Sequence, residues 1–302
     1  MKNAIVIGGG PAGLTAALYL ARAAVDVTVF EKAFYGGKIT ETFEIENYPG
    51  FELVSGFELS EKIRAQAVKA GVKTANREVL SLTKTENCFT VKTKKDEMKA
   101  DAVIFAAGTE KKMLGVKGEA EFSGRGVSYC ALCDGGFYKG KTVFVIGGGN
   151  TAVEDALYLA SLCKEVFLVH RRDEFRAENA VLNAAKKVEN LNFITGAELF
   201  EIKGEKSVNE VLIKTKQGVK SYAADGVFIA IGANPKTELL EEFKITDENG
   251  YIIADREGVT SACGLFAAGD SVKKNCRQIV TAIGDGASAA NSAINYLKQK
   301  DA

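Results

Sequence analysis

The stretch Ile7-Gly8-Gly9-Gly10-Pro11-Ala12-Gly13-Leu14 returns later in the chain as Ile146-Gly147-Gly148-Gly149-Asn150-Thr151-Ala152-Val153. In each copy a short apolar strand leads through a glycine-rich turn into a helix with an apolar face. The first glycine allows a tight turn, the second lets a pyrophosphate approach the backbone, and the small third residue lets helix and strand touch. The helix N-terminus adds free N–H groups and a positive dipole end. The sequence therefore predicts two dinucleotide-binding turns.

The two copies differ where their second strand ends and a ribose should be bound. The first copy ends at Glu31-Lys32, and the Glu31 carboxylate can accept hydrogen bonds from an unmodified ribose diol. The second ends at His170-Arg171-Arg172, with Arg176 four residues on, and such an arginine cluster can clamp a 2′-phosphate. The second site should therefore prefer NADPH over NADH. The alternative is a solvated basic run compensated by Asp173, Glu174 and Glu178.

Length and composition bound the class of protein. The chain has 302 residues, 46% hydrophobic and 26% charged, which is ordinary for a globular protein with two cores. Its 39 Lys and Arg balance 39 Asp and Glu, so no excess of positive charge favours nucleic acid or an anionic membrane. No apolar stretch approaches bilayer-spanning length, and the N-terminal apolar run leads straight into a glycine turn. We expect a cytoplasmic protein that binds neither nucleic acid nor membrane.

The cysteines point to redox chemistry rather than to a metal. Only Cys130 and Cys133 form a close pair, Cys130-Ala131-Leu132-Cys133, and we expect the other four cysteines to be buried, inert thiols. A structural zinc needs four ligands, and no second CxxC or HxxxH completes such a set. We therefore expect no metal site.

The duplication extends beyond the glycine turns. Each half continues with a small β-meander and a closing buried strand, expected at 79–82, 89–93 and 102–108 and again at 199–203, 211–216 and 226–232. The insertion 34–57, the glycine-ended strand 264–270 and a long final helix have no counterpart in the second half. The predicted fold is α/β, with two Rossmann-like domains of a three-layer ββα type. One is discontinuous, 1–112 with 237–302, and the other covers 113–236.

Several motifs together closely resemble a known family over essentially the whole chain, the low-molecular-weight bacterial-type thioredoxin reductases. The matching stretches are Gly8 to Gly13, Glu46-Asn47-Tyr48-Pro49-Gly50, Cys130 to Gly135, Gly147 to Leu159, His170 to Ala177, and Ala267-Ala268-Gly269-Asp270 followed by Arg277-Gln278. The resemblance implies an NADPH-dependent thioredoxin-disulfide reductase, a flavoprotein oxidoreductase that is active as a homodimer.

The resemblance also implies a cofactor for each turn. The discontinuous domain would bind FAD, and the middle domain, which carries the CxxC, would bind NADPH. Asp270 would bond the ribityl chain, the 277–279 stretch would lie along the isoalloxazine, and Asn47 with the Gly36-Gly37-Lys38 turn would line its other side. The residues expected to bind FAD are Gly8, Gly10, Pro11, Ala12, Gly13, Glu31, Lys32, Gly37, Lys38, Asn47, Asp270, Arg277, Gln278 and Ile279. Those expected to bind NADPH are Gly147, Gly149, Asn150, Thr151, Ala152, His170, Arg171, Arg172 and Arg176.

The cysteine pair needs an acid–base partner, because thiol–disulfide exchange proceeds through a thiolate. Asp134 is the only ionisable neighbour in the local sequence, and the single histidine is assigned to the nucleotide, so Asp134 is the candidate catalytic acid/base. The alternative is a turn residue before Gly135-Gly136. The resemblance implies that Cys133 faces the flavin and that Cys130 attacks the partner disulfide.

A mechanical expectation follows from the position of the pair. The Cys pair and the second nucleotide turn share one domain, yet both the disulfide and the nicotinamide must reach the same flavin. Rotation of the NADPH domain between two poses resolves this competition. Hydride would pass from NADPH to FAD and electrons on to the Cys130–Cys133 disulfide, followed by dithiol exchange with oxidised thioredoxin after the rotation.

Three positions depart from the commonest family pattern: Leu132, Lys38 and Gly136, where Thr, Gln and an aromatic residue are usual. Lys38 either raises the flavin potential or points to solvent. Gly136 makes the partner less certain, because the family uses aromatics after the CxxC to grip thioredoxin, whereas Arg125 matches a family contact to thioredoxin. The alternatives are a flavin dithiol oxidase, a reductase of another disulfide partner on the same fold, and a redox-sensing binding protein without turnover.

Overall fold

The computed structural model describes residues 2–42, 44–86 and 88–300. The chain divides into two compact units, residues 1–110 with 234–302, and residues 111–233. The boundaries expected from the sequence, after 112 and after 236, fall two and three residues further along the chain. Each unit is described by itself.

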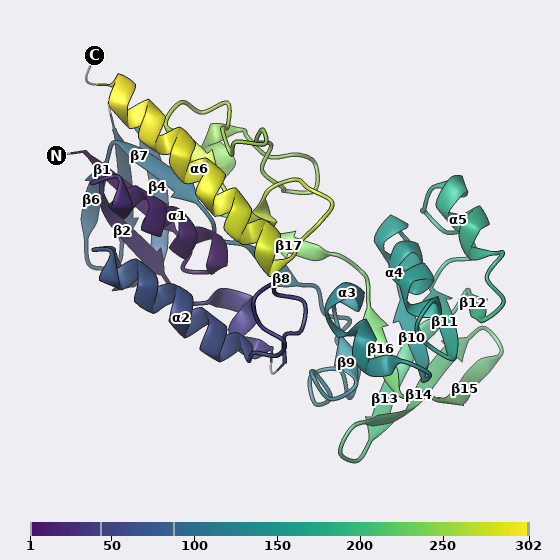
Figure 1. The fold of residues 1–302 in the computed structure, drawn as a ribbon. Coiled ribbons are helices and arrows are strands. Elements are labelled where there is room, and N and C mark those ends of the chain that lie inside the picture. Colours follow the sequence, from purple (N-terminus) through teal and green to yellow (C-terminus); the bar gives the residue numbers. More distant parts are fainter. Residues whose placement is uncertain (1, 43, 87, 301–302) are drawn as a thin grey trace. The chain divides into compact units, whose positions relative to one another are not determined.

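The first unit is built on a five-stranded parallel sheet with the order β18-β7-β1-β2-β3 (Figure 1). A three-stranded antiparallel sheet, β4-β5-β6, forms a second layer. The strands of the unit are β1 (Asn3–Ile7), β2 (Asp26–Glu31), β3 (Lys73–Asn76), β4 (Val79–Lys84), β5 (Phe89–Thr93), β6 (Glu97–Ala100), β7 (Ala102–Phe105) and β18 (Leu265–Ala267). Its helices are α1 (Pro11–Arg22), η1 (Gly37–Glu41), α2 (Gly56–Lys69), η3 (Glu238–Phe243), η4 (Gly269–Ser271) and α6 (Ile279–Gln299).

Strand β1 shows why the first unit has three layers. Ala4 and Val6 belong to the core under helices α1 and α6, whereas Ile5 and Ile7 belong to the core shared with the antiparallel sheet. Successive side chains of a strand point to opposite faces, so a strand covered on both faces is continuously apolar, as this one is.

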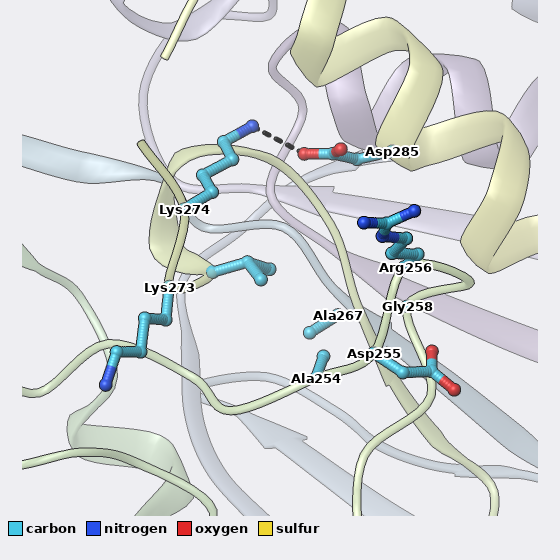
Figure 2. Close-up of a pocket in the computed structure, with 9 residues that line it drawn as sticks. Ala254, Asp255, Arg256, Gly258, Ala267, Lys273, Lys274 and Asp285 are labelled. Atoms are coloured by element: carbon cyan, nitrogen blue, oxygen red, sulfur yellow. Dashed lines mark hydrogen bonds and ion pairs between the residues drawn. The ribbon is translucent and has the colours of Figure 1, made fainter. Parts of the chain in front are cut away.

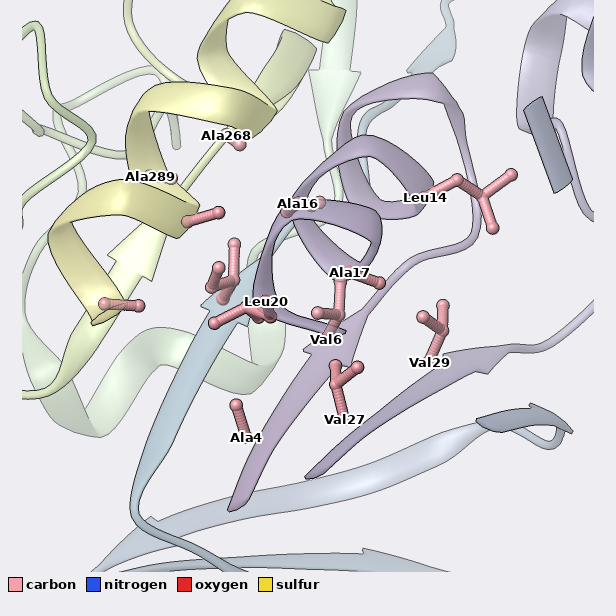
Figure 3. Close-up of a cluster of buried hydrophobic side chains, with 14 of the residues drawn as sticks. Ala4, Val6, Leu14, Ala16, Ala17, Leu20, Val27, Val29, Ala268 and Ala289 are labelled. Atoms are coloured by element: carbon pink, nitrogen blue, oxygen red, sulfur yellow. The ribbon is translucent and has the colours of Figure 1, made fainter. Parts of the chain in front are cut away.

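Helices α1 and α6 cover one face of the parallel sheet and pack closely against each other (Figure 3). Small residues permit this approach: Ala289, Ala290 and Ala293 of α6 are fully buried. A Cβ at Gly286 would lie 2.2 Å from the carbonyl oxygen of Ala12. The long final helix is therefore seated directly on the first turn of α1, where the phosphate-binding N–H groups lie.

The second unit repeats the plan. Its five-stranded parallel sheet has the order β12-β11-β10-β16-β9, and β13-β14-β15 form the antiparallel layer. Its strands are β9 (Val127–Ser128), β10 (Thr142–Ile146), β11 (Glu165–His170), β12 (Leu191–Thr195), β13 (Glu198–Gly204), β14 (Val208–Thr215), β15 (Gly218–Ala223) and β16 (Gly226–Ile229). Its helices are α3 (Ala131–Asp134), η2 (Gly135–Tyr138), α4 (Asn150–Ala160) and α5 (Asn179–Ala185).

The predicted α/β class with two Rossmann-like units is confirmed. The sequence expectation lacked the third meander strands, β6 and β15. Both are short edge strands with mostly exposed side chains, so they lack the apolar alternation that reveals a half-buried strand. The connecting segments β8 (Thr109–Lys111) and β17 (Ala233–Pro235) pair in a two-stranded sheet. Within the described part of the chain, no helix combines the length and the apolar character needed to span a bilayer.

Candidate active site

The first glycine turn, between β1 and α1, fits a nucleotide phosphate. A Cβ at Gly13 would lie 1.9 Å from the carbonyl oxygen of Gly8, so the third glycine is required for helix and strand to touch. At Gly10 the nearest atom to an added Cβ, the oxygen of Gly36, is 4.0 Å away. The second glycine therefore borders open space, as a backbone that a pyrophosphate approaches should.

Glu31 lies at the end of β2 beside this turn, as expected from the sequence. Its Oε2 accepts a hydrogen bond from the Gly9 N–H at 2.8 Å, and its Oε1 accepts one from the Ala33 N–H at 2.9 Å. The carboxylate is thus held rigidly by backbone donors while it keeps further acceptor capacity for a ribose diol. Lys32 pairs instead with Glu78 at 3.8 Å and is half exposed.

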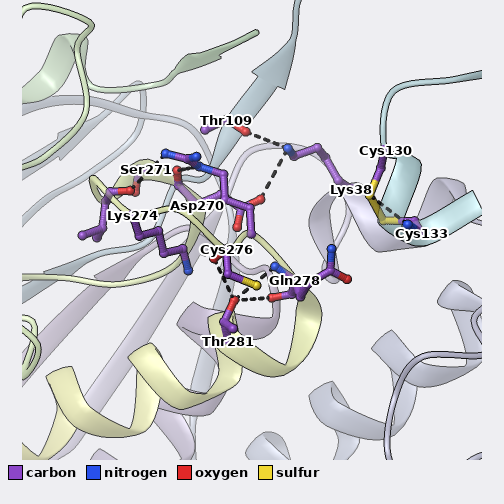
Figure 4. Close-up of polar contacts among 12 residues, drawn as sticks. Lys38, Thr109, Cys130, Cys133, Asp270, Ser271, Lys274, Cys276, Gln278 and Thr281 are labelled. Carbon is purple, nitrogen blue, oxygen red and sulfur yellow. Dashed lines mark hydrogen bonds and ion pairs between the residues drawn. A yellow bond between two sulfur atoms is a disulfide. The ribbon is translucent and has the colours of Figure 1, made fainter. Parts of the chain in front are cut away.

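The Gly36-Gly37-Lys38 turn closes over the first glycine turn. Gly36 and Gly37 have φ angles of 106° and 59°, in the left-handed region that favours glycine, and a Cβ at Gly37 would lie 3.5 Å from the Cα of Gly10. The Lys38 ammonium donates to Thr109 Oγ1 at 2.6 Å and lies 3.5 Å from Asp270 Oδ2 (Figure 4). Lys38 is half exposed and ion-paired with Asp270, and its effect on the flavin potential stays a prediction.

Asp270 lies in η4, directly after β18. The Arg277 Nε donates to the Asp270 carbonyl oxygen at 3.2 Å, and Asn47 Nδ2 donates to Gln278 Oε1 at 3.1 Å. Gln278 is the N-cap of α6, which begins at Ile279 (Figure 4). The structure thus brings Asn47 to the 270–278 segment, from which it is separated by more than two hundred residues in the sequence.

Asp285 and Thr109 are polar residues at this site that the sequence analysis missed. Asp285 Oδ2 accepts from the Gly269 N–H at 3.1 Å and from the Lys274 ammonium at 2.5 Å. A cavity of about 250 Å³ opens beside this contact, lined in part by Lys274 and Asp285 (Figure 2). Asp285 therefore fixes the backbone one residue before Asp270. The sequence gives no signal for this role, because Asp285 lies inside an ordinary helical stretch.

In the second glycine turn, between β10 and α4, the backbone also lies close to its neighbours at the first glycine. A Cβ at Gly147 would lie 2.4 Å from the Ala230 carbonyl oxygen and 2.6 Å from the Ala152 Cβ. At Gly149 an added Cβ would meet no described atom within 4 Å. The second glycine again borders open space, and Asn150 and Thr151 begin α4 there.

His170 lies beneath this turn. A Cβ at Gly148 would lie 2.1 Å from its ring, and the ring stacks on Phe175 with 5.0 Å between centroids. Burial first, and then three nearby arginines, lower the pKa of His170, so the imidazole is neutral at pH 7. Its Nε2 is buried and has no hydrogen-bond partner among the described atoms. A buried, unpaired nitrogen is uncommon in native proteins and fits a site that awaits a polar ligand.

The arginine cluster surrounds His170 and is exposed. Arg171, Arg172 and Arg176 are all exposed, and the charge of each lowers the pKa of His170. Two of the three compensating acids in the alternative have partners outside the cluster: Asp173 pairs with Lys216 at 3.6 Å, and Glu178 accepts from Asn150 Nδ2 at 3.1 Å. The arrangement favours a phosphate clamp over a neutralised surface run.

Cys130 and Cys133 form a disulfide with an S–S distance of 2.07 Å. Cys130 is the N-cap of α3, and its Sγ accepts a hydrogen bond from the Cys133 N–H at 3.2 Å. Such a donor favours negative charge on that sulfur once the disulfide is opened. Cys133 is exposed and Cys130 is partly exposed within the second unit.

Asp134 lies directly behind the disulfide. Burial raises the pKa of its carboxyl, and a hydrogen bond from Ser128 Oγ to Oδ2 at 2.6 Å opposes that rise. A carboxyl whose pKa is raised toward neutrality suits general acid–base work. Ser128 was missed by sequence reasoning, although it lies only two residues before Cys130.

The surface around the disulfide is apolar. Leu132 and Phe137 are 51% and 38% exposed, whereas a Cβ at Gly136 would meet no described atom within 4 Å. Arg125 donates to the Glu121 carbonyl oxygen at 2.6 Å and is exposed. Gly136 lacks the apolar surface that an aromatic residue would offer, whereas Leu132, between the two cysteines, supplies exposed apolar surface.

One expectation for the remaining cysteines was wrong. Cys163 is buried, and burial raises the pKa of its thiol to about 11, but Cys263 and Cys276 are exposed and Cys88 is partly exposed. Both exposed cysteines lie in irregular segments, where apolar neighbours in sequence do not guarantee a buried position. Across the described residues, no cluster of three or more His, Cys, Asp or Glu could hold a metal ion.

The family assignment rests on comparisons with known proteins. The model of the pyridine nucleotide-disulphide oxidoreductase family matches residues 2–286. Thioredoxin reductases from Bacillus subtilis and Listeria monocytogenes are 44% and 42% identical, each over 98% of this chain and 95% and 94% of their own length. The chain belongs to the pyridine nucleotide-disulphide oxidoreductase family. The curated relatives within it are thioredoxin reductases, and the resemblance expected from the sequence is thereby confirmed.

Solved structures agree. The thioredoxin reductase of Streptococcus pyogenes superposes with a TM-score of 0.94 at 41% identity, over 98% of each chain. The Lactococcus lactis thioredoxin reductase in its FR conformation is also 41% identical, over 99% of this chain and all of that one, but gives a TM-score of 0.68.

Proposed function

We propose that this enzyme is a thioredoxin-disulfide reductase that takes electron pairs from NADPH through FAD to the Cys130–Cys133 disulfide. The observation that carries the proposal is the bonded pair at the N-cap of α3, with a buried carboxyl beside it and in the same unit as the second nucleotide turn. The relatives named thioredoxin reductase support the same activity.

We assign FAD to the first unit and NADPH to the second. Support for FAD is the open space at Gly10, the fixed carboxylate of Glu31, and the group of Asp270, Lys38 and Arg277 assembled from distant segments. FAD, when bound, would supply two-electron transfer between the nicotinamide and the disulfide. This unit's own residues would bind and orient it.

Support for NADPH in the second unit is the open space at Gly149, the unpaired buried Nε2 of His170, and the exposed arginines at 171, 172 and 176. His170 is buried beneath Gly148, whereas the arginines are exposed and can close on a 2′-phosphate from the surface.

The residues around the disulfide would manage the protons. Cys133 would accept the incoming electron pair, and Cys130 would attack the partner's disulfide. The hydrogen bond from the Cys133 N–H to the Cys130 Sγ would stabilise the attacking thiolate. Asp134 would protonate a sulfur released when the disulfide opens and would take up a proton when Cys130 attacks.

Rotation of the second unit remains part of the proposal. Two relatives with the same 41% identity differ in whole-chain TM-score, 0.94 against 0.68, and the lower value belongs to a structure described as the FR conformation. A family whose two rigid units occur in more than one arrangement produces such a difference.

The partner, the oligomeric state and the compartment are proposals as well. We propose thioredoxin as the protein substrate, a homodimer as the active form and the cytoplasm as the location. The exposed Phe34, Leu53 and Phe57 of the first unit, 78%, 55% and 65% exposed, are candidates for subunit contact. Sedimentation equilibrium of the FAD-loaded enzyme tests the dimer, and a monomer at micromolar concentration contradicts it.

The activity is tested by anaerobic titration of the yellow enzyme with NADPH. We expect bleaching, then recovery of colour on addition of oxidised thioredoxin. Recovery with oxygen alone would favour a dithiol oxidase, and no bleaching would favour a redox sensor. The matched variant Cys130→Ser/Cys133→Ser should still bleach and should not recover with thioredoxin, because the hydride step does not need the two sulfurs.

The partner is tested at the surface around the disulfide. Leu132→Thr should raise the KM for thioredoxin about fivefold, because about 1 kcal/mol of apolar contact is lost. Reduction of a small aromatic disulfide serves as the control and should stay unchanged. Gly136→Phe should lower the KM for thioredoxin if this protein is the partner. A KM that responds to neither change argues for a different disulfide protein.

A further inference from the structure

Ser128 is the buried hydroxyl next to the disulfide, and its bonds connect the acid with the nucleophilic cysteine. Its Oγ lies 2.6 Å from Asp134 Oδ2, accepts from the Cys130 N–H at 3.1 Å, and lies 3.3 Å from the Cys130 carbonyl oxygen. Ser128 is 4% exposed, on the short strand β9 that ends the parallel sheet of the second unit. One hydroxyl therefore contacts both the carboxyl of Asp134 and the backbone of Cys130.

A hydroxyl has one proton and two acceptor lone pairs, so the three contacts sort into two arrangements. When Asp134 is ionised, the Ser128 hydroxyl donates to its Oδ2 and accepts from the Cys130 N–H. When Asp134 is protonated, the carboxyl donates to Ser128 Oγ, and the Ser128 hydroxyl turns to the Cys130 carbonyl oxygen. In both arrangements every polar group of the set keeps a partner.

Asp134 needs a hydrogen-bond partner in both its charged and its neutral form, because its carboxyl is largely buried. A buried polar group without a partner costs about 1–3 kcal/mol, and more for a charge. Without the hydroxyl the charged form of Asp134 would lose a charge-assisted bond, whereas the neutral form would lose a weaker one. The hydrogen bond from Ser128 accordingly opposes the rise in pKa that burial causes.

We propose that Ser128 is a positioning residue that reverses its hydrogen bond as Asp134 gains and loses its proton, and so lets one buried carboxyl act as both acid and base. The proposal rests on the proposed function through the role of Asp134. When an electron pair opens the disulfide, the released thiolate takes the proton of Asp134, and the Ser128 hydroxyl turns to the new carboxylate. When Cys130 attacks the partner, its thiol proton returns to Asp134 and the hydroxyl turns back.

Other titratable groups face Asp134 and must be controlled. Tyr138 of η2 lies close enough that Asp134, after burial, helps to raise its pKa to about 12, outside the range of assay. Helix α4 packs against α3 and carries Tyr158 next to Gly135, the exposed Glu154, and Asp155. Burial raises the pKa of Asp155 to about 6, within the range of assay. Asp155→Asn therefore serves as a background in which the profile is repeated.

The test is the pH profile of the two half-reactions, measured by stopped-flow absorbance on the FAD-loaded enzyme. Opening of the disulfide needs the protonated acid and slows as pH rises, whereas attack on thioredoxin needs the carboxylate and quickens as pH rises. Ser128→Ala should move both midpoints to higher pH. At the pH optimum of wild-type turnover, attack on thioredoxin should therefore slow about tenfold, whereas opening of the disulfide should not slow. Equal midpoints with a uniformly lower rate would assign Ser128 a merely structural role and overturn the proposal.

A matched pair removes the risk of a folding defect. Thr and Val have the same shape, both suit a strand, and only Thr keeps the hydroxyl. Ser128→Thr should keep the wild-type midpoints and Ser128→Val should show the shift. If the two variants behave alike, the hydroxyl is irrelevant. In the Asp134→Asn background Ser128→Ala should cost little more, because residues that act as one unit are not additive. A fully additive loss contradicts the proposal.

A measurement without turnover separates this inference from the proposed function. The pKa of the Asp134 carboxyl in the oxidised holoenzyme, followed by ¹³C NMR with labelled aspartate, should be higher in Ser128→Ala than in wild type. If thioredoxin is not reduced but this pKa rises, the proposed function fails and the hydrogen-bond relation stands. If thioredoxin is reduced and this pKa does not move, the inference about Ser128 fails alone.

Discussion

The two glycine turns share one backbone plan and differ in what closes over them. In the first unit the Gly36-Gly37-Lys38 turn approaches Gly10, and α6 is seated on Ala12. In both units the second glycine of the turn borders open space, but in the second unit the residues beyond the strand end are exposed arginines. A turn with a second turn and a long helix packed beside it suits a cofactor that stays bound, whereas a turn flanked by exposed residues suits a cofactor that exchanges at each turnover.

The two turns also differ at their third small residue, which is Gly13 in the first and Ala152 in the second. Gly13 has no room for a side chain, whereas Ala152 occupies the equivalent place in the second turn with its Cβ directed toward Gly147. The second turn therefore holds a methyl group at the position where the first turn leaves no room for one.

Gly13→Ala should have the largest effect. The new Cβ would meet the Gly8 carbonyl oxygen at 1.9 Å, so α1 must move away from β1, at a cost of about 3 kcal/mol or more. We expect loss of bound FAD, measured by absorbance after gel filtration, and a lower melting temperature. The matched change Ala152→Gly should retain FAD fully. A Gly13→Ala enzyme with normal FAD content would show that the first turn is not tight.

Arg171→Ala should come next. Loss of a charge-assisted bond to the 2′-phosphate should lower kcat/KM for NADPH about tenfold to a hundredfold and leave that for NADH nearly unchanged. Steady-state kinetics with both nucleotides measure the preference. If Arg171→Ala and Arg176→Ala both keep the preference for NADPH, these arginines do not bind the 2′-phosphate. The result would then favour the alternative of a solvated basic run.

Lys38→Gln should shift the potential of the bound FAD. The Lys38 ammonium lies 3.5 Å from Asp270 Oδ2 in the first unit, and a positive charge near a flavin favours its electron-rich reduced form. The midpoint potential, measured by equilibration with a reference dye, should fall by on the order of 30 mV, a tenfold change for a two-electron couple. Lys38→Arg keeps the charge and should keep the potential. Equal potentials in Lys38→Gln and wild type place this ammonium away from the flavin.

His170 should give the smallest effect, through pH. Because burial lowers its pKa in the folded protein, the unfolded chain binds the proton first as pH falls, and stability is lost as pH falls through the unfolded value near 6.5. Thermal unfolding without NADPH, from pH 7.5 to 5.5, should therefore cost wild type about 1 kcal/mol or less relative to His170→Phe. If the stability of wild type and of His170→Phe changes equally with pH, burial does not lower the pKa of this imidazole.

Motifs that depend on neighbours in sequence were predictable. The glycine turns, the strand-end residues Glu31 and Arg171, and the pairing of Cys130 with Cys133 all follow from local spacing, and the structure places them as spacing requires. The edge strands β6 and β15 were not predictable, because exposed polar residues carry no periodic signal. The exposure of Cys263 and Cys276 was misjudged for a related reason: burial depends on what covers a loop.

The sequence by itself determined the α/β class, the duplicated nucleotide turns, the cysteine pair and the family, because each is written in residues that are close along the chain. Only the tertiary structure decided which partners those residues have. Lys38 meets Asp270 across more than two hundred residues, and Ser128 meets the carboxyl of Asp134 through a short strand that pairs with β16. Hydrogen bonds and ion pairs form wherever packing brings groups within about 3 Å, and packing is a property of the whole fold.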